Sequence, residues 1–555
     1  MNDRTDEIRS TRAPTLGEDQ IEILGRYGQT RGTEAGQVLF RAGDPSNDFI
    51  VVLEGEVEMV DDFAGEARTI GVFRAGRFLG ELPMLTGQGL YLSAVVRQGG
   101  RILAISRERL KEVVTEEANL SDIILKAFLA RRSYLMRVGV GLRIIGSRHS
   151  SDASRLREFA ARNRLPHVWI ELEDDPKAEA LLKKFGAKPS ETPVTIWQGE
   201  DVLLNPTNAE LARTMGLKVD APGERAYDLV VVGAGPAGLG ASVYGASEGL
   251  STLALESVAL GGQAGTSSRI ENYLGFHAGL SGFELTSRAL IQADKFGART
   301  AVPEEAVSLK REGGYYRIGL SEGGEVVARS VIAASGARYR RLDVPRCGLF
   351  EGVSIHYAAT EAEAQRCEGE EVAVVGGGNS AGQAAVYLAG RTRRVYLLIR
   401  GDDLGKSMSR YLVDRITSAG NVELLANTEI RELMGGDRLD GVVVEDNRSG
   451  ARRTLGARAL FFFIGAEANT GWLKGAVELD QRGFVLTGRE LDGSALEEDA
   501  WRGLSREPYP LETSLPGVFA AGDVRSGSIK RVASAVGEGS MTVRLVHQYL
   551  ADTGV

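Results

Sequence analysis

Two stretches of this chain decide its fold: residues 228–244, DLVVVGAGPAGLGASVY, and residues 371–387, EVAVVGGGNSAGQAAVY. They align without a gap, down to the shared Val-Tyr pair at their ends. Each begins with a run of β-branched residues, passes through a glycine-rich turn and continues as a helix-forming stretch. A repeat on this scale indicates duplicated domains, and strand, turn and helix in that order predict two Rossmann-type α/β domains that bind dinucleotides.

The first turn has the spacing G-x-G-x-x-G, in which each glycine has its own physical role. Gly233 makes the tight turn, Gly235 lets the backbone approach a pyrophosphate, and Gly238 lets helix and strand pack closely. Pro236 and Ala237 open the helix, whose N-terminus then faces the negative charge. The alternative is an ordinary tight turn between strand and helix, without a ligand.

The residue that follows the second strand of each repeat predicts which nucleotide binds. In the first repeat it is Glu256, whose carboxylate suits a ribose 2′-hydroxyl. In the second repeat the matching position is Ile399, and Arg400 follows it. A guanidinium in place of a carboxylate favours a 2′-phosphate, so we expect NADPH, with NADH as the alternative coenzyme and a solvated arginine as the alternative interpretation. The other coenzyme contacts are expected from the second turn and its helix: Gly376, Gly378, Asn379, Ser380 and Ala381.

The composition restricts the classes of function. The chain has 555 residues, of which 43% are hydrophobic and 25% charged, as is normal for a globular protein of several domains. Its net charge of −9 argues against binding to nucleic-acid polymers or anionic membranes. No apolar run reaches the ~20 residues that span a bilayer, and the polar, acidic N-terminus is unlike a secretory signal.

The cysteine content points to a reducing compartment, and the histidine content gives no sign of a metal site. The two cysteines, Cys347 and Cys367, are too far apart for a Cys-x-x-Cys motif. We therefore expect a cytoplasmic protein without structural disulfides. The five histidines have no metal-ligand spacing, so no metal site is predicted.

The N-terminal half is expected to hold two further domains. Between residues 36 and 105, short β-type runs at 37–40, 49–53 and 57–60 alternate with glycine turns, which predicts a small β-roll. Two helices, at 107–117 and 120–136, follow it. Residues 142–216 predict a compact α/β unit. Its strands are expected at 142–145, 167–172 and 194–197, its helices at 152–163 and 176–185, and a linker at 218–226.

From Asp228 onward the chain resembles the low-molecular-weight thioredoxin reductases of bacteria, within the pyridine nucleotide–disulfide oxidoreductase group. Besides the glycine turns, the resemblance rests on residues 261–264 (GGQA), 270–273 (IENY), 513–524 (TSLPGVFAAGDV) and 530–533 (KRVA). It implies FAD in the first repeat, NADPH in the second, and a homodimer. It also implies FAD contacts from Gly262, Gln263, Asn272, Gly522, Asp523, Arg531, Val532 and Ala533. Because the FAD domain of this family is split, we place it at 227–345 and 464–555, with the NAD(P)H domain at 346–463.

The chain departs from this family at the redox centre. Where the family has Cys-x-x-Cys before the second glycine motif, residues 353–361 read VSIHYAATE. Tyr357 and Thr360 align with the cysteines and Glu361 with the family's acid, so these three are the candidate catalytic positions of a degenerate centre. Neither tyrosine nor threonine can form a disulfide or a thiolate. Cys347 and Cys367 flank the segment, and we interpret them as ordinary buried cysteines.

Residues 1–136 resemble a cyclic nucleotide-binding domain. The resemblance centres on Gly80, Glu81 and Leu82, within the stretch FLGELPML at 78–85. The family's glutamate binds the ribose hydroxyl, which implies that role for Glu81. The family's phosphate-binding arginine aligns with Leu92. A buried phosphate without a cation is costly, so we expect the fold without binding of cyclic AMP or cyclic GMP.

Residues 141–217 resemble a thioredoxin or glutaredoxin fold. Thr192-Pro193 matches that fold's cis-proline. The redox cysteines are replaced by residues 151–154, SDAS, which offer a good helix cap and no dithiol chemistry.

Together these features predict a multidomain flavoenzyme: a β-roll of cyclic nucleotide-binding type, a thioredoxin-like α/β unit and two Rossmann-type domains. We expect NADPH to reduce FAD, and reduced FAD to pass electrons to an external acceptor such as ferredoxin, a quinone, dioxygen or a protein disulfide. Two alternatives stay open. One is a thioredoxin-disulfide reductase that uses a partner's thiols. The other is a nucleotide- or redox-sensing scaffold whose flavin does not turn over.

Overall fold

The computed structural model describes residues 13–44, 48–63, 66–86, 89–175, 177–199, 201–217, 226–267, 270, 272–340, 342–350, 353–357, 359, 361–436, 438–491, 501, 504 and 506–554. Thr360 and Glu271 lie outside these residues. The chain divides into two compact units: residues 1–222 with 257–259 and 291–304, and residues 223–256 with 260–290 and 305–555.

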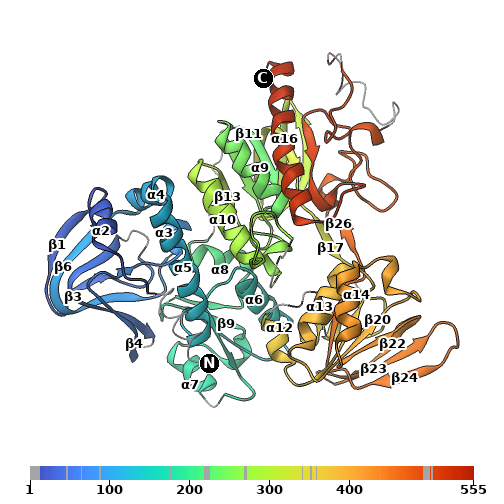
Figure 1. Ribbon diagram of the computed structural model, residues 1–555, viewed down its shortest axis with the longest axis horizontal. Coiled ribbons are helices and arrows are strands. Elements are labelled where there is room, and N and C mark those ends of the chain that lie inside the picture. The colour runs from blue at the N-terminus through green and yellow to red at the C-terminus, as the bar shows by residue number, and fades with distance from the viewer. Residues whose placement is uncertain are drawn as a thin grey trace. The chain divides into compact units, whose positions relative to one another are not determined.

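The first unit begins with an antiparallel β-roll, drawn in blue in Figure 1. Its strand order is β1-β6-β3-β4, with β2 pairing with β6 and β5 with β3. The strands are β1 (Gln29–Thr33), β2 (Val38–Phe40), β3 (Phe49–Phe63), β4 (Glu66–Arg74), β5 (Phe78–Leu79) and β6 (Ser93–Ile105). The helices are α2 (Glu18–Gly25), α3 (Pro83–Thr86), α4 (Arg107–Glu116) and α5 (Ala118–Val138). The predicted β-roll and its two following helices are therefore confirmed.

One strand prediction in the roll is wrong. The runs at 49–53 and 57–60 belong to the single strand β3, which spans 15 residues. The register between β3 and β6 shifts around Gly55, which has φ +90°. A Cβ at Gly55 would lie 2.4 Å from the carbonyl oxygen of Gln98, so the glycine marks a bulge inside one strand instead of a turn between two.

The second part of this unit is a compact α/β fold with sheet order β10-β9-β7-β8. Strands β7 and β8 are parallel, whereas β9 is antiparallel to β7 and to β10. The elements are β7 (Leu142–Gly146), α6 (Ser151–Arg162), β8 (His167–Glu171), α7 (Ala178–Lys184), β9 (Val194–Trp197), β10 (Asp201–Leu204) and α8 (Asn208–Thr214). The predicted strands and helices are confirmed, but β10 and α8 were not foreseen. The thioredoxin-like identity of this part stays a prediction.

Two local expectations in this α/β part have clear outcomes. The peptide bond between Thr192 and Pro193 is cis, as the resemblance implied. The cap of α6 is Ser150, whose Oγ accepts a hydrogen bond from the amide of Ala153 at 3.2 Å. The cap thus lies one residue before the predicted Ser-Asp pair, and Asp152 sits in the first helical turn, where an acid suits the helix dipole.

The second unit contains a sheet in which β12, β11 and β16 are parallel neighbours. Strands β15 and β14 continue it in antiparallel fashion, and β27 pairs with β16 in parallel. Its strands are β11 (Tyr227–Val232), β12 (Thr252–Leu255), β14 (Ala306–Glu312), β15 (Tyr315–Leu320), β16 (Glu325–Ala333) and β27 (Val518–Ala520). Its helices are α9 (Pro236–Ser247) and α16 (Val532–Thr553), and α10 (Gly282–Lys295) begins in it. The last residues of α10 and strand β13 (Arg299–Ala301) are counted with the first unit. Figure 1 shows α9 and α16 side by side, and their apolar residues share one core with the sheet.

The residues between β16 and β27 form a second parallel sheet, with order β18-β25-β19-β20-β21. Its strands are β18 (Ile355–His356), β19 (Glu371–Val375), β20 (Arg394–Leu398), β21 (Val422–Leu425) and β25 (Ala459–Phe462). Helices α11 (Cys347–Phe350), α12 (Glu361–Arg366), α13 (Asn379–Ala389) and α14 (Arg410–Ser418) accompany it. An antiparallel sheet of β22 (Thr428–Gly435), β23 (Leu439–Asp446) and β24 (Arg452–Leu455) follows, and β17 (Ala337–Tyr339) pairs with β26 (Ala466–Ala468).

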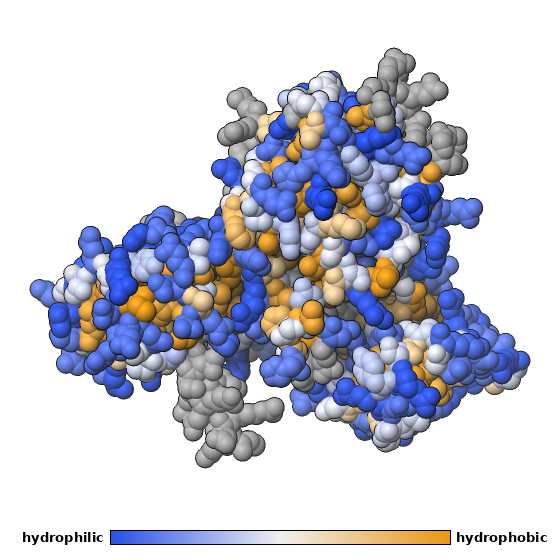
Figure 2. All heavy atoms as spheres, turned by 45° about the horizontal axis from the view of Figure 1, so that its top comes forward, coloured by the Kyte–Doolittle hydropathy of each residue, from blue (hydrophilic) through white to orange (hydrophobic). Residues whose placement is uncertain are grey.

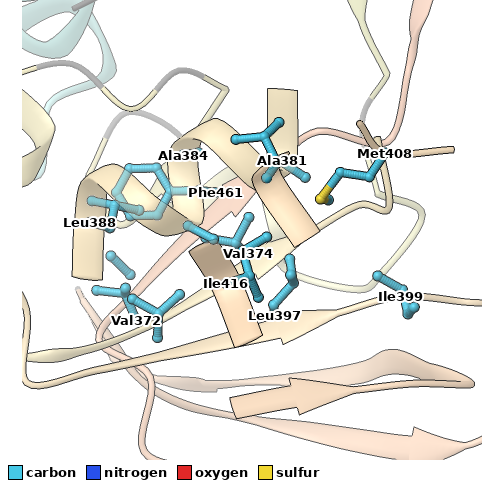
Figure 3. Packing of buried hydrophobic residues seen from close by; sticks show 14 of the residues in the cluster. Val372, Val374, Ala381, Ala384, Leu388, Leu397, Ile399, Met408, Ile416 and Phe461 are labelled. Carbon is cyan, nitrogen blue, oxygen red and sulfur yellow. The ribbon is translucent and has the colours of Figure 1, made fainter. Parts of the chain in front are cut away.

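Alternate residues of the second sheet supply two separate cores. Val372, Val374 and Leu397 point to one face, where they meet residues of α13 and α14 such as Leu388 and Ile416 (Figure 3). Ala373, Val375 and Leu398 belong to the core on the other face, which includes residues of β22 and β23. A strand that is buried on both faces reads as a continuous apolar run, as 372–375 does.

Hydrophilic residues dominate the face shown in Figure 2, with hydrophobic residues scattered among them. No helix within the described part of the chain is long and apolar enough to cross a bilayer.

A buried carboxylate ties together the C-terminal segment of the second unit. Glu512 is fully buried, and its two oxygens accept hydrogen bonds from the Arg506 guanidinium at 2.6 and 2.9 Å. The backbone amides of Tyr509 and Gly517 donate to the same oxygens, each at 2.8 Å. Arg506 also reaches Asp552 of α16 at 3.0 Å, so this one carboxylate fixes the segment that leads into β27 against the last helix.

We predict that Glu512→Ala lowers the free energy of unfolding by about 3–5 kcal/mol, because it leaves the Arg506 guanidinium without its buried partner. The matched control is Glu507→Ala, an exposed carboxylate five positions earlier, which should change stability by less than about 0.5 kcal/mol. Urea unfolding of the full chain, followed by fluorescence, measures both. Equal unfolding midpoints for the two variants would contradict the role of Glu512.

Candidate functional site

The first glycine turn has the geometry of a dinucleotide cradle. Gly233 has φ +107°, and a Cβ there would lie 2.3 Å from the carbonyl oxygen of Ala334. A Cβ at Gly238 would lie 1.8 Å from the carbonyl oxygen of Gly233, so α9 and the turn pack too closely for a side chain. A Cβ at Gly235 would meet only the Cα of Gly262, at 3.9 Å. Two glycines are thus required by packing, and the middle one leaves open space where a pyrophosphate fits.

Glu256 lies directly after β12, as predicted, but its carboxylate has a contact that sequence alone did not indicate. Its Oε2 accepts a hydrogen bond from the backbone amide of Ala234 at 2.9 Å. The residue is buried, so this bond holds the turn between Gly233 and Gly235 in place. The contact of Glu256 with a ribose hydroxyl stays a prediction.

The GGQA segment lies against this turn. The amide of Gly261 donates to the carbonyl oxygen of Ala234 at 2.8 Å, and a Cβ at Gly262 would lie 2.9 Å from the Cα of Gly235. The Gln263 side chain donates to the carbonyl oxygen of Ala337. Gly262 and Gln263 therefore border the cradle, whereas Asn272 is exposed in the following loop. The FAD contacts expected from these three residues stay predictions.

The segment 513–524, near the other end of the chain, lies against the first glycine turn and its helix. Gly522 has φ +78°, and a Cβ there would lie 2.9 Å from the Cβ of Ala237 in the first turn of α9. Burial raises the pKa of the neighbouring Asp523 above its usual value. Asp523 is thus a carboxyl group for which a hydrogen-bonding partner would be favourable.

Glu538 of α16 is a site residue that the sequence did not reveal. Its Oε2 accepts a hydrogen bond from the amide of Gly522 at 2.7 Å, and its Oε1 lies 2.7 Å from the guanidinium of Arg525. No local pattern signals this contact, because Glu538 is an ordinary helical residue in sequence. The exposed Arg531 precedes α16, and Val532 and Ala533 form its first turn.

The second glycine turn repeats the first in its backbone. Gly376 has φ +144°, and a Cβ there would lie 2.3 Å from the carbonyl oxygen of Phe463. A Cβ at Gly378 would have no atom within 4 Å. Ala381 is buried where helix and strand pack, whereas Asn379 and Ser380 are exposed at the helix N-terminus. The turn therefore offers the same open space at the start of α13.

The loop after β20 is hydrogen-bonded to this second turn. The Asn379 Oδ1 accepts a hydrogen bond from the amide of Ser409 at 2.7 Å, and the Ser407 hydroxyl donates to the carbonyl oxygen of Gly377 at 2.9 Å. Neither serine was foreseen, since both contacts join positions 30 residues apart.

Arg400 is exposed and directly follows the buried Ile399, at the carboxyl end of β20. The same loop carries Asp402, which pairs with Lys406 at 2.6 Å and with Arg448 at 3.2 Å. The hydrogen bond from Lys406 holds the pKa of Asp402 below its usual value. Lys406 and Arg448 add positive charge near this strand end, and sequence reasoning missed both.

The predicted redox segment, residues 353–361, includes β18 and packs against the second parallel sheet. The Tyr357 ring is half-buried and lies 5.8 Å from the Phe462 ring, and Glu361 begins α12. The neighbouring His356 is buried against Phe461, with ring centroids 5.2 Å apart. Burial lowers the pKa of His356 to about 4, so the imidazole is neutral near pH 7. The catalytic roles expected for Tyr357, Thr360 and Glu361 stay predictions.

The two cysteines lie on opposite faces of the second sheet. Cys347 belongs to the core that contains Ala373 and Val375, and Cys367 to the core that contains Val372 and Val374. These four residues alternate along β19, so a complete layer of sheet separates the thiols. Both cysteines are buried, and neither forms a disulfide. Burial raises the pKa of the Cys367 thiol to about 11, and its Sγ donates to the carbonyl oxygen of Glu363 at 3.0 Å.

Within the β-roll, Glu81 is buried and its Oε2 accepts a hydrogen bond from the amide of Tyr91 at 3.2 Å. Gly80 has φ +140°, and Leu82 is buried beside Glu81. Leu92, at the position of the family's arginine, is also buried. No group of three or more His, Cys, Asp or Glu side chains that could hold a metal ion occurs among the described residues.

Two family models match this chain. The model described as pyridine nucleotide-disulphide oxidoreductase matches residues 227–539. That of the cyclic nucleotide-binding domain matches residues 31–117, which cover most of the β-roll and helix α4. The second match confirms the expected identity of the N-terminal domain.

Individual relatives cover the C-terminal part. The chain is 33% identical over 333 residues to a thioredoxin reductase of Treponema pallidum, a match that spans 59% of this chain and 98% of the relative. It is 31% identical over 375 residues to NADPH-dependent thioredoxin reductase 3 of Arabidopsis thaliana, spanning 64% of this chain and 66% of the relative. The solved structure of T. acidophilum thioredoxin reductase matches with a TM-score of 0.52 and 28% identity, over 59% of this chain and 99% of that one.

A pair of matched glycine variants tests the two cradles. Gly235 and Gly378 have φ −74° and −91°, which any residue can adopt, and neither has an atom closer than 3.9 Å to an added Cβ. We therefore predict that Gly235→Val folds but is purified without FAD, because the side chain fills the pyrophosphate space. Gly378→Val should keep its yellow FAD yet lose reduction by NADPH. Absorbance near the flavin band and stopped-flow reduction measure the two effects, and a Gly235→Val protein with a full complement of flavin would disprove the first assignment.

A second prediction concerns coenzyme choice. Arg400→Ala should weaken NADPH binding by ~1.5–3 kcal/mol, the range for hydrogen bonds to charged groups, and leave NADH binding nearly unchanged. The control is Arg394→Ala, which removes an arginine at the opposite end of β20 and should affect neither coenzyme. Titration of each variant with NADP⁺ and NAD⁺ gives the affinities. Equal losses for both coenzymes would show that Arg400 does not read the 2′-phosphate.

Proposed function

We propose that this chain, which belongs to the pyridine nucleotide-disulphide oxidoreductase family and is an FAD-dependent NAD(P)H oxidoreductase, works without an internal dithiol. It oxidises NADPH and reduces an acceptor outside the polypeptide. The observation that carries the proposal is the position of its cysteines. The sequence has two, and a sheet separates them.

The described residues fit both dinucleotides. The open space at Gly235, bordered by Gly262 and by the start of α9, suits the FAD pyrophosphate, and Asp523 suits its ribityl hydroxyls. The open space at Gly378 suits the NADPH pyrophosphate, and Arg400 its 2′-phosphate. When bound, FAD supplies the redox chemistry, taking a hydride from NADPH and releasing two electrons to an acceptor.

The chain's own residues offer no thiol route for those electrons. A dithiol relay needs an accessible thiolate and a second thiol within about 7 Å between Cα atoms. Cys367 is buried with a pKa raised to about 11, so its thiolate is scarce near pH 7. Cys347 belongs to the core on the other face of the sheet. The acceptor therefore has to approach the flavin directly.

A quinone gives the simplest balanced reaction. NADPH loses a hydride and becomes NADP⁺, and the quinone gains the two electrons of that hydride together with two protons, one of them from solvent, to become a hydroquinone. A protein disulfide is the second candidate acceptor, because relatives of this chain are thioredoxin reductases. In that case the exchanging thiols belong to the partner protein. A cytoplasmic homodimer is part of the proposal.

We predict that the double variant Cys347→Ala/Cys367→Ala oxidises NADPH with an artificial quinone as fast as the wild type. Alanine suits both positions, because each thiol is packed among apolar side chains. Steady-state loss of NADPH absorbance, normalised to bound flavin, measures the rate. A variant that binds FAD and NADPH normally but no longer turns over would prove that a cysteine takes part.

The same assay separates the proposal from its alternatives. Catalytic reduction of thioredoxin by the wild type would favour the disulfide reductase. A single reduction of each flavin, followed by no turnover with quinone, ferredoxin, dioxygen or thioredoxin, would favour a sensing scaffold.

A further inference from the structure

The β-roll contains a pocket that the nucleotide chemistry of the C-terminal half does not use. It lies between strands β3, β4 and β5, helix α5 and the residue that precedes β6. Most of its lining is apolar, including Met59, Val72, Leu79, Leu92 and Leu135. Polar groups enter it from Glu81, Arg77, Arg131 and Tyr134.

Glu81 is the unusual member of this lining. It is 5% exposed, and its Oε2 accepts the one hydrogen bond from Tyr91. Its Oε1 is buried and has no hydrogen-bond partner among the described residues. Burial raises the pKa of this carboxyl to about 7. Buried carboxyl oxygens are nearly always hydrogen-bonded, so an unsatisfied one on a side chain that lines a pocket indicates a missing ligand group.

The rest of the pocket does not suit a phosphate. Leu92 stands where the cyclic nucleotide-binding family has its arginine, and it is 4% exposed. Arg131 does reach the pocket, but its two Nη groups donate to the carbonyl oxygens of Gly80 and Phe78, at 2.7 and 2.8 Å. Its guanidinium also lies over the Phe78 ring at 4.6 Å. Arg131 therefore acts as a structural link between α5 and the roll, and Arg77 is half-buried, so its charge keeps contact with water.

The size of the pocket agrees with this chemistry. Its volume is about 120 Å³. Cavities of about 150 Å³ take up benzene, whereas sites for drug-sized ligands measure roughly 300–1,000 Å³. A single ring or a short branched chain fits such a space.

From these observations we propose that the β-roll pocket binds a small uncharged molecule in which one hydroxyl group, hydrogen-bonded to Glu81 Oε1, is carried on an apolar ring or short chain, in place of a cyclic nucleotide. The hydroxyl satisfies the buried carboxyl oxygen, and the apolar body contacts Leu92 and its neighbours.

The test compares pairs of probes that differ in the hydroxyl alone. Phenol with toluene, and cyclohexanol with methylcyclohexane, are titrated into the full chain and followed by ligand-observed NMR, alongside cyclic AMP and cyclic GMP. We expect at least one hydroxylated probe to bind about tenfold or more tightly than its methyl counterpart, since the hydroxyl replaces a missing buried hydrogen bond. Neither cyclic nucleotide should displace it.

Two variants locate the binding. Glu81→Met keeps the length of the side chain and should abolish the preference for the hydroxyl, so that the paired probes bind alike. Leu92→Trp leaves Glu81 unchanged and fills the pocket with a larger side chain, so it should abolish binding of all the probes. This second variant keeps the test valid if the first one fails to fold. The proposal is overturned if no hydroxylated probe binds, if the methyl probes bind the wild type equally well, or if a cyclic nucleotide displaces the hydroxylated probe.

Discussion

One steric constraint positions both nucleotide sites: the first glycine of each turn lies against a carbonyl oxygen just beyond the neighbouring central strand. The added Cβ would stand 2.3 Å from Ala334 O at Gly233 and 2.3 Å from Phe463 O at Gly376. Each contact packs the glycine turn tightly against the residue that follows the neighbouring parallel strand. The two strands are β11 and β16 in one sheet and β19 and β25 in the other. The helix N-terminus is thereby aimed at the carboxyl edge of the sheet, where α/β folds bind their ligands. Everything else at the sites is arranged around these two fixed points.

The two copies of the motif differ in what covers their helices. In the first, small residues let α9 and α16 touch through their backbones, since a Cβ at Gly539 would lie 2.0 Å from the carbonyl oxygen of Ala237. In the second, Gly382 of α13 receives the side chain of Met408 instead. The first site is thus enclosed by a helix near the end of the chain, whereas the second is bordered by a loop from its own repeat. This difference suits a resident cofactor in the first site and an exchanging coenzyme in the second.

Local pattern was sufficient where the structure depends on neighbours in sequence. The strand, turn and helix that open both repeats, the helices that follow the β-roll and the first three strands of the α/β part follow from periodicity and glycine position. It failed where a contact joins distant segments. Glu256 was placed correctly after its strand, but its bond to Ala234 was not foreseen, and nothing near Glu538 signals its bond to Gly522. The prediction of two separate strands around Gly55 was wrong for a related reason, because only the pairing with β6 shows that Gly55 lies in a bulge inside one strand.

The same limit applies to the cysteines, and it bears on the proposed electron route. Their spacing in sequence excluded a Cys-x-x-Cys motif, but only the alternation of β19 reveals that they occupy different cores. Bringing the thiols together would require one of them to cross a sheet whose backbone is hydrogen-bonded on both sides, which means unfolding the domain that holds the coenzyme. A redox relay between them and an intact NADPH site therefore exclude each other. For this reason the proposed route sends electrons outward from the flavin, and the identity of the acceptor depends on what can approach that cofactor.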